Sequence, residues 1–74
     1  MIYPYKISSK EDLYKLSELA SQEDYPIYIS FEHGQVDAKS LLALFSIIGK
    51  DVNIVAADHA SSADFSKFLR RLAK

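Results

Sequence analysis

A chain of 74 residues with 49% hydrophobic and 26% charged residues suits one small domain and is too apolar to stay disordered. Its net charge of −1 gives no electrostatic reason to expect nucleic-acid binding. The absence of cysteine excludes disulfides and thiolate metal sites, and no apolar run approaches the roughly 20 residues of a membrane span. We therefore expect a single cytoplasmic domain, residues 1–74, with no metal, cofactor or membrane contact.

The chain begins with a predicted strand and a predicted helix. Residues 2–7 alternate as in a strand, and Pro4, which cannot donate to a ladder, places that strand at a sheet edge. Ser8 and Ser9 are predicted helix caps, with Glu11 and Asp12 three residues on as their reciprocal capping partners. The helix that follows carries apolar residues near one face: Leu13, Leu16 and Ala20.

A predicted β-hairpin comes next. Residues 26–32 alternate between apolar and polar side chains, which is typical of a half-buried strand. His33-Gly34 is the predicted two-residue turn, and residues 35–38 pair back as the third strand.

The second half of the chain predicts a helix, a strand and a last helix. Ser40 caps a short and almost wholly apolar helix, and residues 51–57 alternate as a fourth strand. The last helix begins near Ser61, and its core-facing stripe has the spacing i, i+3, i+4 and i+7: Phe65, Phe68, Leu69 and Leu72. The basic residues of the tail fit a solvated helix end.

The order of the predicted elements indicates an α+β fold. Four strands and three amphipathic helices favour helices packed on one face of a mainly antiparallel sheet. A ferredoxin-like or ACT-type domain shares the first six elements but has a different strand order. Periodicity does not separate these two arrangements.

One segment carries a specific resemblance. Residues 36–49, VDAKSLLALFSIIG, closely resemble the regulatory-serine region of the HPr family, the small phosphocarrier proteins of the bacterial sugar phosphotransferase system. The resemblance implies an HPr-like open-faced β-sandwich, βαββαβα, with strand order 1-4-2-3 and three helices on one face. That order puts the first strand at an edge, as Pro4 requires.

The phosphocarrier histidine of that family has no counterpart here. Family members carry it at the cap of the first helix in a Gly-Leu-His-Ala-Arg-Pro-like run, whereas this chain reads ISSKED over residues 7–12. The resemblance places Ser9 near the histidine position, Glu11 at the arginine and Asp12 at the proline. Two carboxylates in the first turn repel a phosphate, so phosphoryl transfer through this site is not expected.

No other residues form a recognisable catalytic or metal site. His33 and His59 stand in predicted loops without a partner base or metal-ligand spacing, and Asp58-His59 is the stronger of the two candidates. Neither a G-x-S-x-G sequence nor a glycine-rich phosphate loop is present. We therefore expect a protein that is not an enzyme.

The second helix offers two functional candidates. The resemblance implies that a dedicated HPr kinase phosphorylates Ser40 and that the phosphoprotein docks on a transcriptional regulator; the simpler interpretation is a plain helix cap. Leu41, Leu42 and Phe45 form a second apolar arc, apart from the arc that faces the sheet. The family uses the matching residues to bind partner proteins. Deeper burial of this helix, or dimerisation through it, explains the arc equally well.

The sequence thus predicts an HPr-like regulatory or protein-interaction module without the phosphocarrier histidine. It resembles HPr paralogues that lack the histidine and keep the serine, although the whole cap of the first helix is remodelled here. Two alternatives stay open. One is a phosphocarrier that uses His59 or His33, and the other is an ACT-like domain that binds a small ligand.

Overall fold

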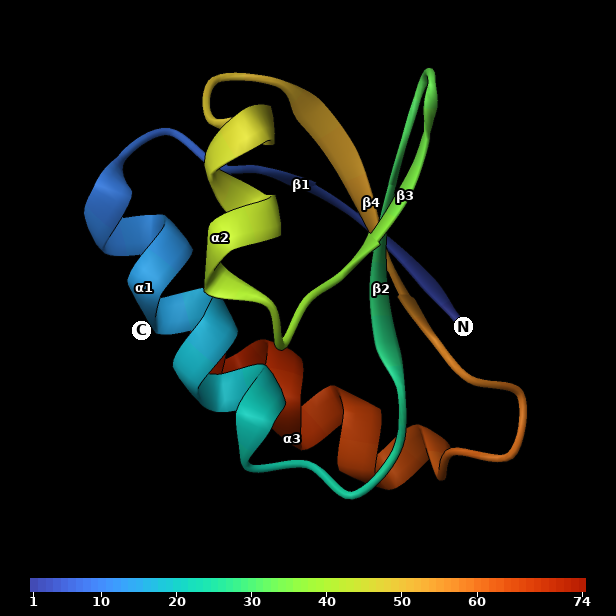
Figure 1. Cartoon of the computed structure of the whole chain (residues 1–74). Helices are drawn as coiled ribbons and strands as arrows, with labels where there is room; N and C mark the ends of the chain where they lie inside the picture. The colour runs from blue at the N-terminus through green and yellow to red at the C-terminus, as the bar shows by residue number, and fades with distance from the viewer.

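The computed structural model describes residues 1–74. It contains four strands and three α-helices (Figure 1). In chain order the elements are β1 (Ile2–Lys6), α1 (Lys10–Ser21), β2 (Ile27–Phe31), β3 (Gly34–Asp37), α2 (Leu41–Leu44), the 3₁₀ helix η1 (Phe45–Ile47), β4 (Asp51–Ala56) and α3 (Ser62–Leu72). The observed order of strands and α-helices is the one that the sequence predicts.

The four strands form one antiparallel sheet in the order β1-β4-β2-β3. β1 lies at an edge of the sheet, as the sequence predicted from Pro4. Proline has no backbone N–H, and at an edge that N–H is not needed for a hydrogen bond to a neighbouring strand. This strand order is the HPr-like order, and it excludes the ferredoxin-like and ACT-type arrangement.

The helices cover one face of this sheet and leave the other face open (Figure 1). Alternation on the strands directs Ile29 and Ile54 toward the helices, and both side chains are fully buried. The apolar faces of the helices complete the same core, in which the side chains of Leu16 and Phe68 are also buried. Burial of these apolar side chains is the main source of stability for so small a domain.

The β2–β3 turn differs from the prediction by one residue. The two turn residues are Glu32 and His33, and Gly34 already pairs with Phe31 as the first residue of β3. Gly34 has a φ of 150°, a backbone conformation that glycine adopts without a Cβ penalty. The glycine therefore follows the turn instead of forming its second residue.

The segment after Ser40 is less regular than one continuous helix. Only Leu41–Leu44 is α-helical, and the chain then tightens into η1 before it enters β4. None of the helices is both long and apolar enough to cross a membrane.

Candidate functional site

Side chains of neighbouring residues cap the N-terminus of α1. Ser9 adopts extended backbone geometry and its hydroxyl accepts a hydrogen bond from Asp12 N (3.2 Å). The Asp12 carboxylate in turn accepts a hydrogen bond from Ser8 N (3.1 Å). This is the reciprocal capping that the sequence predicted, except that the carboxylate reaches one residue farther back.

This helix end is also anionic. Glu11 and Asp12 both lie in the first turn of α1, where carboxylates are favoured by the helix dipole. Burial, together with the nearby Asp12 carboxylate, raises the pKa of the Tyr5 phenol. The negative charge of Asp12 therefore acts on the end of β1 as well as on α1.

Neither histidine lies at this helix end. His33 belongs to the β2–β3 turn, with 78% of its side chain exposed, and its Nε2 is 3.9 Å from Glu32 Oε2. His59 is exposed in the turn between β4 and α3. No group of three His, Asp or Glu side chains has an arrangement that could hold a metal ion.

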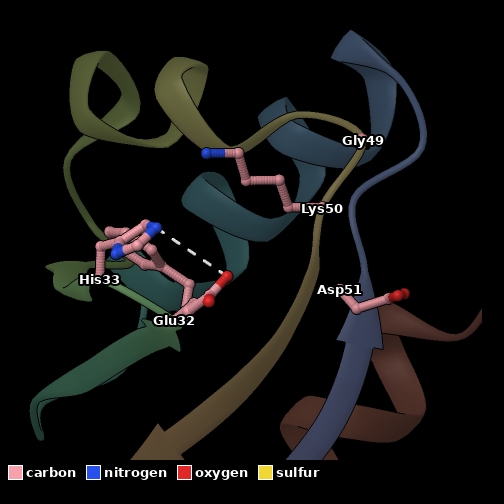
Figure 2. A pocket seen from close by; sticks show the side chains of 6 residues that line it. Glu32, His33, Gly49, Lys50 and Asp51 are labelled. Atoms are coloured by element: carbon pink, nitrogen blue, oxygen red, sulfur yellow. Dashed lines mark ion pairs between the residues drawn. The ribbon is translucent and has the colours of Figure 1, made fainter.

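An open hollow of about 440 Å³ lies beside the turn that carries His33. Figure 2 shows Glu32 and His33 on one side of it, with Lys50 on the opposite side and the Asp51 side chain pointing away from them. The Lys50 ammonium stands 6.0 Å from the centre of the Phe31 ring. The hollow contains no pairing of a nucleophile with a base, and its polar side chains are solvated.

A second open hollow, of about 390 Å³, lies between the α1–β2 connection and α3. Arg71 crosses it and donates to Gln22 Oε1 (2.6 Å). Burial of Tyr25, helped by the Glu23 carboxylate, raises the pKa of its phenol to about 12. The phenol is therefore protonated at neutral pH and donates to Glu23 Oε1 (3.4 Å).

Ser40 is the N-cap of α2, as predicted. Its hydroxyl accepts a hydrogen bond from Ala43 N (3.4 Å), and its side chain is half-buried. The neighbouring Lys39 extends away, because its ammonium donates to Glu23 O beyond the end of α1 (2.9 Å). Lys39 thus supplies the positive charge that the last turn of α1 lacks.

The two apolar arcs of the second helix are separated as the sequence predicted. Leu44 and Ile47 are fully buried, whereas Leu42 is 83% exposed. Leu41 and Phe45 are exposed beside Leu42. The burial of one arc leaves the other facing solvent, since the short segment Leu41–Ile47 packs against the rest of the fold along one side.

Tyr14 of α1 joins this exposed arc, and the sequence did not reveal it. The rings of Tyr14 and Phe45 meet edge to face with their centres 6.1 Å apart, and Tyr14 is 48% exposed. Its position on the outer face of α1 was the available signal, but the contact needs the tertiary packing of α1 against η1. We call Tyr14, Leu41, Leu42 and Phe45 the apolar patch.

Comparisons with known proteins identify the fold. The sequence matches no protein-family model and no curated protein. Among solved structures, HPr-C-His from Thermoanaerobacter tengcongensis superimposes with a TM-score of 0.72 at 17% identity, covering 99% of this chain and 86% of that one. The phosphocarrier protein HPr from Bacillus anthracis str. Ames gives a TM-score of 0.70 at 21% identity, covering 99% and 92%. The chain therefore has the HPr-like fold over its whole length.

Proposed function

We propose that this chain is an HPr-like protein-interaction module of the bacterial cytoplasm, related to the phosphotransferase system, that carries no phosphoryl group on a histidine. It docks on a protein partner through the apolar patch and has no enzymatic activity. The likeness of its fold to HPr proteins supports the relationship with that system.

The observation that carries the proposal is the N-terminus of α1. Ser9 caps it by accepting from Asp12 N, Asp12 accepts from Ser8 N, and the carboxylates of Glu11 and Asp12 occupy the place where a phosphoryl group would need positive charge. A serine hydroxyl that accepts the capping bond also lacks a neighbouring base. This helix end consequently suits a structural cap and not a phosphoryl carrier.

The apolar patch supports the docking function. Leu42 at 83% exposure leaves apolar surface in water, and aromatic side chains such as Tyr14 and Phe45 are typical anchors of protein interfaces. The four residues of the patch are few compared with the roughly 20–30 residues per partner of a standard stable interface, which favours a transient complex over a permanent dimer.

Ser40 gives this module a candidate regulatory site. Phosphorylation by an HPr kinase would place two negative charges beside Leu41 at the rim of the patch, and a docked transcriptional regulator is one partner that such a switch would serve. The Ser40 hydroxyl is half-buried in its capping bond, so the kinase must release that bond.

Phosphoryl transfer from Enzyme I tests the loss of the carrier function. The protein is incubated with Enzyme I and phosphoenolpyruvate, and an HPr phosphocarrier serves as the positive control. We expect no acid-labile phosphate by mass spectrometry. An acid-labile phosphohistidine at His59 or His33 would support the alternative phosphocarrier and overturn the proposal.

Treatment with HPr kinase and ATP separately tests Ser40, with Ser40→Ala as the control. If no phosphoserine forms at Ser40, the chain has no regulatory site there.

Substitution of Phe45 tests the docking function. Phe45→Asp should abolish partner capture and leave the protein folded, because the ring is exposed. Ser46→Asp is the matched control, since it adds the same charge at an exposed neighbouring position outside the patch. If Phe45→Asp changes neither the captured partners nor the solution mass, the patch is not a contact surface.

A further inference from the structure

Four cations gather on the exposed side of the last helix. Lys67, Arg70, Arg71 and Lys74 have the spacing i, i+3, i+4 and i+7, and all four are exposed. The opposite side of α3 is buried in the core, as Phe68 shows. The cations therefore face solvent together, and we call these four residues the basic stripe.

The basic stripe makes the charge of the chain uneven. Residues 62–74 contain four of the nine basic residues and one of the ten acidic residues, so they carry a net charge of +3. The rest of the chain carries −4, since the whole chain has −1. The helix dipole favours Arg70 and Arg71 in the last turn of α3, but Lys67 lies in the middle of the helix, where the dipole has little effect. The stripe is therefore more than a basic helix end.

No carboxylate pairs with the basic stripe. The one ion pair in the structure lies in the β2–β3 turn. Arg71 donates to the neutral amide oxygen of Gln22, which leaves its charge uncompensated. On α1, the exposed Glu11 and Glu18 make no ion pair, and Lys15 adds a fifth cation at the end of α3 by donating to the last carbonyl of the chain. The positive charge of the stripe is thus available to a partner.

Carboxylates at one end of the basic stripe limit the size of an anionic partner. Asp64, Glu23 and Asp24 line the same open hollow as Lys67 and Arg71. A nucleic-acid strand or a membrane surface extends beyond the stripe and would bring its phosphates against these carboxylates. Insertion into a membrane also needs large apolar side chains beside the cations, and the other exposed residues of α3 apart from Asp64 are serine and alanine.

We propose that the basic stripe binds a short acidic helix of a partner protein. Lys67 and Lys74 are seven residues apart, about 10.5 Å along a helix. Glutamate or aspartate residues with the spacing i, i+3, i+4 and i+7 on a partner helix form a stripe of the same length and opposite charge. This surface lies on α3, whereas the apolar patch lies on α1, α2 and η1, so the chain offers two separate surfaces to its partners. Because its ion pairs are exposed, the complex is weak and sensitive to salt.

Titration with helical peptides tests the inference on the full chain. One alanine-rich peptide of about 18 residues carries glutamates at the spacing i, i+3, i+4 and i+7, and the other carries lysines at the same positions. We expect the glutamate peptide to shift the amide resonances of residues 67–74, with an affinity that falls about threefold or more between about 0.05 and 0.3 M salt. The variant Lys67→Glu/Arg70→Glu should bind this peptide about tenfold more weakly, because two exposed attractions become repulsions, and should bind the lysine peptide instead.

The matched control makes the same change of charge away from α3. Lys6→Glu/Lys10→Glu alters two exposed lysines and should bind both peptides as the native chain does. Equal weakening by this control, or binding that salt does not weaken, would overturn the role of the basic stripe.

Vesicles of anionic lipid and a short DNA duplex, titrated at the same salt concentrations, separate the acidic helix from other anions. Shifts of residues 67–74 with either of them but not with the glutamate peptide would overturn the acidic helix as the partner, and so would the absence of shifts with all three. Neither result changes the docking function of the apolar patch, which the Phe45→Asp variant tests separately.

Discussion

At the scale of single residues, three serines begin the three α-helices by the same hydrogen bond. The hydroxyls of Ser9, Ser40 and Ser61 each accept from the backbone N–H three residues later, at 3.2, 3.4 and 3.3 Å. The sequence predicted Ser9 and Ser40 as caps and a helix that begins near Ser61, because serine is a preferred N-cap residue at the start of a helix. What distinguishes Ser40 is its neighbourhood, since Leu41, Leu42 and Phe45 of the apolar patch follow it.

Tyr25 is the residue whose protonation should control stability in alkali. The phenol has a pKa near 10 in the unfolded chain and about 12 in the folded one, so its contribution is complete below pH 10 and is lost as the pH rises to 12. We expect the free energy of unfolding to fall by about 1–3 kcal/mol over this interval.

Tyr25→Phe isolates this effect. Urea unfolding at several pH values between 8 and about 12 should show a smaller alkaline loss for Tyr25→Phe than for the native chain. Tyr14→Phe, which changes an exposed tyrosine, is the control and should follow the native profile. Identical pH profiles for the native chain and Tyr25→Phe would show that this phenol is not responsible.

At the scale of elements, the strands and α-helices were predicted well and their ends less well. Alternation of apolar residues located the strands, since a buried face imposes it. The turn was predicted one residue too late. The sequence shows that a glycine stands near the turn, but not whether its unusual backbone conformation belongs to the turn or, as observed for Gly34, to the first residue of the next strand. The transition from α2 to η1 at Phe45 was not predicted, because a segment that is apolar on nearly every side has no periodicity to reveal it.

The edge strand β1 is protected against pairing with another chain. Its odd-numbered residues direct their backbone toward β4, as the hydrogen bond from Ala56 N to Met1 O shows (2.9 Å). The backbone N–H and C=O positions of the even-numbered residues Ile2, Pro4 and Lys6 therefore point away from β4, toward solvent. Pro4 removes the central donor of this edge, and the charge of Lys6 discourages a second strand.

Pro4→Val should restore that donor and promote self-association. Each new edge-to-edge hydrogen bond contributes about 1 kcal/mol, so we expect a concentration-dependent dimer in light scattering after size exclusion. Tyr3→Val is the control, because its backbone already faces β4. A Pro4→Val chain that stays monomeric at every concentration would show that the proline is not what blocks pairing.

At the scale of the whole molecule, the candidate site depends on contacts that join distant parts of the chain. Helical geometry predicted Leu41, Leu42 and Phe45 as a second apolar arc, and the resemblance to the HPr family implied that this arc is exposed, with deeper burial or dimerisation left open as alternatives. The sequence did not predict Tyr14, because the edge-to-face contact with Phe45 exists only once α1 and η1 pack together. For the same reason it did not predict the hydrogen bond from Lys39 to Glu23, which are 16 residues apart.

In the short segment from Leu41 to Ile47, the buried side chains should determine the stability of the fold and the exposed side chains the docking of a partner. A domain of this size is stable by about 4–11 kcal/mol. Ile47 is fully buried, so Ile47→Ala should cost about 2–5 kcal/mol, a large share of that stability. Leu42 is 83% exposed, so Leu42→Ala should change the free energy of unfolding by less than about 0.5 kcal/mol.

Urea unfolding and partner capture measured on the same variants decide whether this separation holds. Leu42→Ala should weaken partner capture while keeping native stability, since it removes apolar surface that only a partner covers. Ile47→Val, which keeps the buried side chain nearly intact, should lose about 1 kcal/mol of stability and capture the partner normally. If Leu42→Ala instead destabilises the fold as much as Ile47→Ala, the exposed arc serves the domain itself, and docking through the patch is wrong.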